Sequence, residues 1–282
     1  MRHRLSPFLT VVVRPPTLVQ LGAGATGAPV LQPPPWLAPD ATADLLRWLQ
    51  TFRSGRELER RAADLGMTPA DVAELLDALR DHGLLETEPP RSPLRVHLQG
   101  RGPVADAVLG ELAALDAVRV SAGTARGWSP TGREIDLVLL TDHLSPDPAL
   151  VARLMRERVP HLPVVLRDGA GVIGPLVLPG AGPCLRCLDR SRSDADPGWP
   201  TLACQLFGRS GRASAQVLRM TAAVAAQQVD AVAAGRWDCA PPPDVLGCTL
   251  EIEGSAIAVR RWFMHPGCGC GVSTPSAAEA AG

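Results

Sequence analysis

The stretch Asp168-Gly-Ala-Gly-Val-Ile-Gly-Pro-Leu-Val-Leu-Pro-Gly-Ala-Gly-Pro-Cys-Leu-Arg-Cys187 runs from an apolar segment through glycine-rich turns into a C-x-x-C pair. A second pair, Cys268 and Cys270, follows much later with C-x-C spacing. Each pair can supply two thiolates from one turn, and four thiolates make a tetrahedral zinc site. Glycines and prolines flank both pairs, so backbone N–H groups can approach the sulfurs. The spacing therefore predicts a structural zinc ion held by Cys184, Cys187, Cys268 and Cys270.

Disulfides are the alternative explanation for these cysteines. The first pair could bridge locally, but the members of the second pair flank a single residue, which is a poor geometry for a bridge. Arg14, Pro15 and Pro16 interrupt any apolar run near the start, so no secretory signal is predicted and a cytoplasmic location is expected. Cytoplasmic thiols favour a metal over disulfides. Three further cysteines share no spacing and are predicted to be small core residues: Cys204, Cys239 and Cys248.

Composition limits the function classes. A chain of 282 residues predicts one large or two modest domains, and 46% hydrophobic residues are enough for a core. The net charge of −1 gives no general attraction for nucleic acid, and the lack of a long apolar run predicts no membrane span. All 28 basic residues are arginine, and the chain has neither lysine nor asparagine. Any mechanism that needs a lysine is therefore excluded.

Two short strands are predicted at Thr17–Leu21 and Ala28–Leu31, around the turn Gly22-Ala-Gly-Ala-Thr-Gly27. This turn is a literal G-x-G-x-x-G, but a dinucleotide fingerprint must open a helix. Pro29 and the prolines at 33–35 prohibit a helix there, so the pattern predicts a hairpin.

Three helical segments are predicted over residues 40–88. Asp40 is expected to cap the first, Gly66 to end the second after about Arg56–Leu65, and Thr68 to cap the third. Two strands and three helices with a tight turn are typical of a winged-helix unit. Its third helix carries four acidic residues and one arginine, which phosphates would repel, so DNA binding is not favoured.

Strand–helix alternation follows a proline-rich linker and predicts a doubly wound parallel sheet. The alternating segments are Leu94–Leu98, Val104–Leu115, Val118–Val120, Ile135–Leu140, Ala149–Val159 and Leu162–Leu166. A long helix over Ser214–Ala234 and two antiparallel strands, Cys248–Glu253 and Ala256–Trp262, lead to the second cysteine pair. The expected organisation is an N-terminal extension (1–16), a winged-helix domain (17–88), a linker (89–93), an α/β domain with the zinc site (94–271) and a disordered tail (272–282).

These residues resemble the ThiF/ubiquitin-activating-enzyme superfamily, as adapted in azole-forming peptide natural-product pathways. The stretch from Asp168 to Cys187 resembles that family's strand, glycine turn and Pro-Cys-x-x-Cys approach to a zinc knuckle. The long helix, the hairpin and the closing cysteine pair follow in the family's order. The resemblance covers roughly residues 94–271 and implies a degenerate Rossmann-like domain. Residues 17–88 resemble the small leader-recognition element fused before such domains.

The family's activating enzymes bind ATP with a glycine turn, an acidic ribose contact, an Asn-Arg-Gln motif and a lysine. Gly100-Arg-Gly102 has the strand–turn–helix context, but residues 121–124 offer no carboxylate, and asparagine and lysine are absent. The resemblance thus implies a relic nucleotide site at Gly100, Gly102 and Asp142, with ATP and magnesium not expected to bind. Asp142 would be a former magnesium ligand or, as we favour, a helix cap or loop residue.

The resemblance implies a non-adenylating scaffold that binds a leader peptide for a modifying enzyme such as a YcaO-type cyclodehydratase. The peptide is expected to add to the edge of the sheet at 17–31 and to contact Leu21, Val30, Val72 and Leu76. The apolar stripe of the 214–234 helix gives a slight preference for a homodimer. Two alternatives remain open, an ATP-dependent adenylyltransferase of the ThiF type and a winged-helix DNA-binding regulator.

Overall fold

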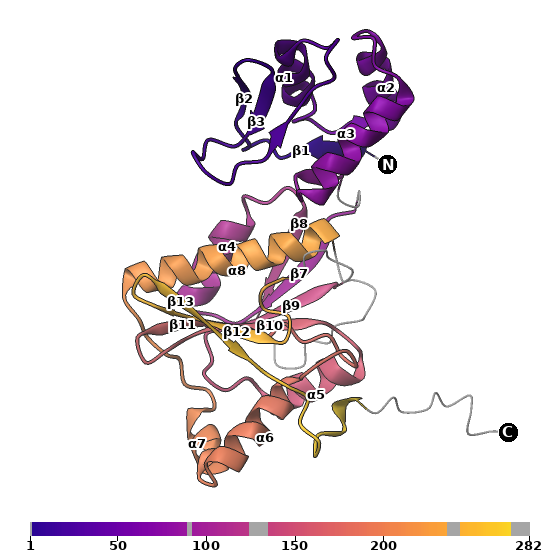
Figure 1. Cartoon of the computed structure of the whole chain (residues 1–282). Helices are drawn as coiled ribbons and strands as arrows, with labels where there is room; N and C mark the ends of the chain where they lie inside the picture. Colours follow the sequence, from indigo (N-terminus) through magenta and orange to yellow (C-terminus); the bar gives the residue numbers. More distant parts are fainter. Residues whose placement is uncertain (1, 89–91, 124–134, 236–242, 272–282) are drawn as a thin grey trace, which may run out of the picture. The chain divides into compact units, whose positions relative to one another are not determined.

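The computed structural model describes residues 2–88, 92–123, 135–235 and 243–271 (Figure 1). The chain divides into two compact units, Met1–Pro89 and Pro90–Gly282, and each has its own hydrophobic core. No helix in these ranges is long and apolar enough to cross a membrane.

Two three-stranded antiparallel sheets form the N-terminal unit together with three helices. One sheet has the order β5-β1-β6, from β1 (Arg2–Leu5), β5 (Arg53–Ser54) and β6 (Leu85–Thr87). The other has the order β2-β3-β4, from β2 (Val11–Arg14), β3 (Leu18–Leu21) and β4 (Val30–Leu31). Residues 1–16 were expected to be an extension, and this is wrong. Leu5 and Val11 are buried in the core of the unit, which holds β1 and β2 in the two sheets.

The hairpin predicted around Gly22–Gly27 is confirmed, because β3 and β4 pair antiparallel with Gln20 opposite Val30. The Gln20 amide donates hydrogen bonds to the carbonyls of Gly22 and Gly24, which closes the turn. No helix follows the glycines, as the prolines require.

The three predicted helices are present as α1 (Pro39–Trp48), α2 (Gly55–Ala63) and α3 (Pro69–Asp81). The Thr68 cap of α3 is confirmed, since its hydroxyl accepts a hydrogen bond from the Asp71 N–H in a capping box. The Asp40 cap of α1 is wrong. Ala38 occupies that position, and Asp40 lies inside the first turn, where its charge still complements the helix dipole.

A three-layer arrangement makes up the C-terminal unit (Figure 1). The seven-stranded sheet has the order β13-β12-β11-β10-β9-β7-β8. Its strands are β7 (Leu94–Gln99), β8 (Val118–Gly123), β9 (Leu137–Thr141), β10 (His161–Arg167), β11 (Ala170–Ile173), β12 (Cys248–Glu253) and β13 (Ala256–Arg261). The predicted parallel sheet is confirmed for β8, β7, β9 and β10, and β11–β13 extend it with antiparallel pairing.

Helices cover both faces of this sheet. α4 (Pro103–Leu112) and α8 (Ala215–Gly235) pack on one face, and α5 (Pro148–Arg156) packs on the other. Alternate residues of β9 point to opposite sides, so Leu137 and Leu139 join the α4–α8 core, whereas Val138 and Leu140 join the α5 core. Burial on both faces explains why the strand reads as a continuous apolar run.

His161, the first residue of β10, should make the stability of this unit depend on pH. Its Nδ1 lies 3.0 Å from the Val159 carbonyl oxygen, and burial lowers its pKa to about 4, although that hydrogen bond opposes the shift. The folded pKa is below the unfolded value, so this contribution is present above pH 6.5 and is lost as the pH falls toward 4. His161→Leu should remove about 3 kcal/mol of the loss between pH 7 and 4, measured by urea unfolding. Equal acid sensitivity of both proteins would contradict this.

Candidate functional site

The four cysteines predicted to bind zinc come together in the C-terminal unit. Cys184 is the N-cap of α6 (Leu185–Ala195) and Cys187 lies in its first turn. The second pair sits where the chain turns after β13, around a short 3-10 helix, Gly269–Gly271. All four sulfurs lie within 4.8 Å of one another, so the cluster could hold a metal ion.

The sulfur spacing fits tetrahedral coordination. The Sγ atom of Cys184 is 3.8 Å from that of Cys187 and 3.7 Å from that of Cys268. Metal–sulfur bonds of about 2.3 Å in a regular tetrahedron separate the sulfurs by about 3.8 Å. Cys187 and Cys270 are closer, at 3.3 Å. Two of the sulfur separations thus match a tetrahedral site, and the cluster could hold a metal ion.

Burial and hydrogen bonds shift the pKa values of three of these thiols in different directions. Cys184, Cys187 and Cys268 are buried, and desolvation raises the pKa of Cys184 well above its usual range and that of Cys270 to about 11. Burial also acts to raise the pKa of Cys187, but hydrogen bonds from the backbone and from neighbouring thiols lower it to about 7. Four sulfur ligands leave no open position for water, so a metal here would have a structural role.

The side chain of Asp142 binds the backbone that follows the glycine turn. Its Oδ1 and Oδ2 accept hydrogen bonds from the backbone N–H groups of Val104 and Ala105, each at 3.1 Å. The carboxylate is buried and caps the N-terminus of α4. In a nucleotide-binding turn those N–H groups face the phosphates. In this structure those N–H groups donate to the Asp142 carboxylate.

The glycines of the turn serve this internal contact. A Cβ at Gly102 would lie 2.5 Å from Oδ1 of Asp142, and a Cβ at Gly100 would lie 2.8 Å from the carbonyl oxygen of Thr141. Glycine is therefore needed for the close approach of residues 141–142 to the turn. Close approach to a ligand is not required to explain these positions.

Residues 207–212 form a strap along the carboxyl ends of β9 and β10, which sequence reasoning missed. The carbonyl of Arg209 accepts a hydrogen bond from Leu144 N–H at 2.9 Å, and that of Arg212 accepts one from Gly169 N–H at 3.0 Å. A Cβ on Gly211 would clash with the Leu166 carbonyl, so this glycine was the available signal. Ligands of open α/β sheets bind at the carboxyl ends of the strands, and here the chain itself lies there.

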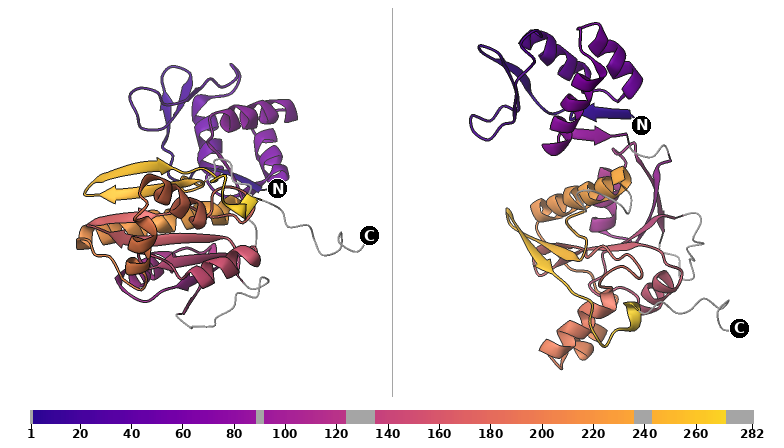
Figure 2. Two further views of the ribbon diagram at one scale, coloured as in Figure 1. Left: turned by 90° about the horizontal axis from the view of Figure 1, so that it is seen from below. Right: turned by 45° about the vertical axis from the view of Figure 1, so that its right-hand side comes forward.

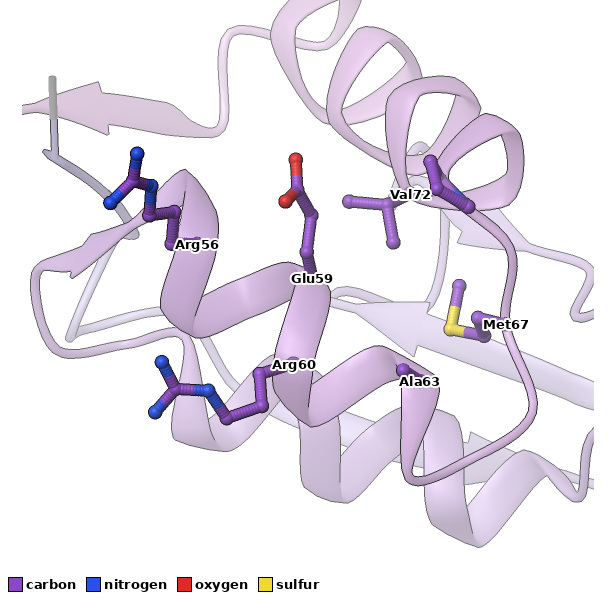
Figure 3. Close-up of a pocket in the computed structure, with 7 residues that line it drawn as sticks. Arg56, Glu59, Arg60, Ala63, Met67 and Val72 are labelled. Atoms are coloured by element: carbon purple, nitrogen blue, oxygen red, sulfur yellow. The ribbon is translucent and has the colours of Figure 1, made fainter.

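The four predicted peptide contacts differ in accessibility. Leu21 and Val72 are buried in the core of the N-terminal unit, Leu76 is half-buried, and Val30 is 38% exposed. Val30 lies on the outer face of its sheet beside Gln20 and Val12. Val72 also contributes to a hollow of about 410 Å³ between α2 and α3 (Figure 3). The hollow is lined by Arg56, Glu59, Arg60, Ala63, Met67, Pro69 and Val72.

The remaining cysteines were expected to be core residues. Cys204 is exposed, so this expectation is wrong for that residue. Cys248 is half-buried at the start of β12, and Cys239 lies outside the described residues. Cys204 lies on a helix that has no buried residue. The apolar sequence around Cys204 did not indicate that this helix is exposed.

No protein-family model and no curated protein matches the chain, but solved structures do. A heterocyclase in complex with substrate and cofactor superposes with a TM-score of 0.63 at 17% identity, over 95% of this chain and 39% of that chain. E. coli MccB with ATP superposes with a TM-score of 0.56 at 13% identity, over 96% and 99%. The microcin C7 biosynthetic enzyme MccB in complex with N-formylated MccA gives 0.56 at 12% identity, over 96% and 100%.

These similarities show the fold. The chain spans 39% of the length of the heterocyclase and nearly the whole of MccB. At identities of 17% or less, the likeness shows that the chain shares its fold with these two enzymes.

Proposed function

We propose that this protein is a peptide-binding scaffold of the ThiF-like fold that does not adenylate its client. The observation that carries the proposal is the Asp142 carboxylate at the N-terminus of α4. An ATP phosphate at that position would meet a buried negative charge instead of free N–H donors. The triphosphate would also lack the lysine that the family's enzymes use, because the chain has none.

The four cysteines are proposed to bind zinc. Four thiolates in a tetrahedral arrangement are typical of structural zinc sites. The ion would tie the start of α6 to the segment after β13 and would contribute to folding rather than to chemistry. Metal binding needs reduced thiols, and the cytoplasmic location that we also propose would keep them reduced.

Peptide binding is assigned to the N-terminal unit, which we interpret as a winged helix. The outer edge of β4 has no partner strand among the described residues, so an extended peptide could pair with it. Val30 offers an exposed apolar side chain on that strand. The hollow between α2 and α3 offers the apolar side chains of Ala63, Met67 and Val72, with Glu59 pointing toward Val72, and a side chain of the peptide could insert there (Figure 3).

Val30→Asp should weaken binding of a ribosomal leader peptide about tenfold or more, because it places a charge in an apolar contact on the pairing strand. The matched control is Val12→Asp, which lies on the same sheet face with 39% exposure but on the opposite edge strand. Isothermal titration with the leader of a precursor encoded near the gene provides the measurement. Equal losses for the two variants would argue against pairing at β4.

The enzyme that modifies the bound peptide is proposed to be a separate protein, such as a YcaO-type cyclodehydratase. The supporting observation is that a heterocyclase shares the fold over 95% of this chain. A homodimer through α8 would have to use Met220 and Val224, which are half-buried, because Val217 and Val229 already pack in the core. Light scattering would distinguish a monomer, whose chain mass is 29.7 kDa, from a dimer of twice that mass.

A ThiF-type adenylyltransferase is the second candidate function. The observation in its favour is that MccB was solved with ATP and superposes over 96% of this chain. DNA binding is disfavoured, since α3 carries Asp71, Glu74, Asp77 and Asp81 against a single arginine, Arg80, which is paired with Asp77.

A further inference from the structure

Helix α7 (Trp199–Leu206) is an apolar helix that buries none of its residues. It contains no charged side chain, and Leu202 is 46% exposed. With α6 it extends from the sheet on the side away from α8 (Figures 1 and 2). A surface helix normally turns a charged face to solvent, so α7 lacks the composition of a solvent-facing element.

A second apolar segment follows β13, and helix α6 connects it to α7 through Arg192. Phe263 is 77% exposed and Met264 is 48% exposed. The guanidinium of Arg192 lies 4.8 Å from the ring centroid of Trp199 and 5.4 Å from that of Trp262, which places both indoles at one side chain. We call these residues of the two segments the apolar patch: Trp199, Leu202, Trp262, Phe263 and Met264.

The two indoles are fixed by hydrogen bonds. Nε1 of Trp199 donates to Asp189 Oδ1 at 3.3 Å, and Nε1 of Trp262 donates to the Thr249 hydroxyl. Arg192 between them is mostly buried, and this desolvation lowers its pKa. The two indoles are thus held in place, which reduces the entropy that they would lose on binding a partner. Exposed aromatic and apolar side chains in such a cluster mark an interaction site.

Charges around the patch indicate the kind of partner. Three carboxylates of this region already have partners. Asp189 pairs with Arg192, and Glu251 pairs with Arg167 at 3.2 Å. Asp194 contacts Nε2 of His265 at 2.8 Å. Arg209 and Arg261 are exposed and take part in none of the ion pairs found among the described residues. Asp196, just before α7, is also exposed and outside these ion pairs, although it accepts a hydrogen bond from Gly198 N–H at 2.8 Å. The unpaired charges of the rim are therefore two arginines and one carboxylate, which is an excess of positive charge. A second copy docked on the same patch by two-fold symmetry would bring arginines against arginines.

We propose that the apolar patch docks the modifying enzyme through an apolar surface rimmed by carboxylates on that enzyme. The identity of the enzyme rests on the proposed function, whereas the position and chemistry of the surface rest on α7 and the segment after β13. This surface lies in the C-terminal unit and the peptide site lies in the N-terminal unit, so the two interactions can be measured separately.

Charge insertion into the patch tests the proposal. Phe263→Glu and Leu202→Glu in the full chain should each weaken binding of the purified YcaO-type enzyme from the same gene neighbourhood about 30-fold, measured by biolayer interferometry without peptide. Phe8→Glu is the matched control, because Phe8 is 93% exposed in the N-terminal unit, and it should change affinity less than twofold. Arg261→Glu should weaken binding about tenfold and reduce its salt dependence.

Three results would overturn the proposal. One is equal affinity for Phe263→Glu and Phe8→Glu, with unchanged melting temperatures. Another is no binding of the enzyme by the wild-type chain. The third is a dimer of the wild-type chain that Phe263→Glu converts to a monomer, which would assign the patch to a second copy. Leader-peptide titration of the same proteins reports on the proposed function independently, and the patch variants should bind peptide like wild type.

Discussion

Cys187→Ser should abolish metal binding and remove most of the stability of the C-terminal unit. Cys187 is fully buried and links the start of α6 to Cys270. Structural zinc sites contribute about 10–16 kcal/mol of binding free energy in small peptides, and a whole domain is stable by only about 5–15 kcal/mol. We therefore expect a loss of about 5 kcal/mol or more in guanidinium unfolding, and less than half an equivalent of zinc by elemental analysis.

Cys204→Ser is the control for this substitution, because Cys204 is exposed and outside the cluster. It should retain full metal content and should change the free energy of unfolding by less than about 0.5 kcal/mol. Wild-type protein purified under reducing conditions without bound metal would contradict the zinc site itself. A metal-free Cys187→Ser protein as stable as wild type would contradict its role in folding.

Asp142→Ala should cost about 4 kcal/mol, because two buried N–H groups at the start of α4 lose a charged acceptor. The comparison variant is Asp147→Ala, which removes a hydrogen bond of 2.9 Å to Ala149 N–H at the exposed cap of α5. An exposed cap of that kind is worth about 1 kcal/mol. Chemical denaturation of both variants measures the difference, and equal losses would show that Asp142 is not the anion that α4 depends on.

The same variant tests the proposal that Gly100, Gly102 and Asp142 are a relic nucleotide site. If Asp142 only fills a site that is otherwise competent, Asp142→Ala should gain ATP affinity. We expect no gain, because asparagine and lysine are absent and no carboxylate follows the second strand at 121–124. Isothermal titration with ATP and magnesium makes the measurement, and micromolar binding by the variant would show that the missing groups have been replaced elsewhere.

Local signals made much of the fold predictable. Pro29 and the prolines at 33–35 excluded a helix after the glycine turn, and Thr68-Pro69 placed the start of α3 correctly. The strand β1 was missed because its sequence, Arg-His-Arg-Leu, is polar. Its arginines pair with Glu86 and Glu88 far along the chain, at 2.6 and 2.8 Å. Pairing of that kind leaves no periodic apolar pattern in the strand itself.

The candidate sites, like the fold, include features that the local sequence predicted and features that depend on contacts between distant residues. Short spacing within each cysteine pair predicted the cluster, and the fold brings the two pairs together. Asp142 could be read in two ways because its hydrogen-bond partners, Val104 and Ala105, are distant in sequence. The strap at 207–212 depends on backbone hydrogen bonds to two strand ends, which composition does not encode. Peptide contacts proposed from pattern included Leu21, which the structure buries in the core.

A pyrophosphate-exchange assay combined with peptide titration tests the central claim most directly. The full chain is mixed with a leader peptide, ATP and magnesium, and both exchange and peptide affinity are measured. We predict micromolar peptide binding whose Kd is unchanged by ATP, and exchange no greater than without protein. Peptide-dependent exchange above background would contradict the account and establish an adenylating enzyme in its place.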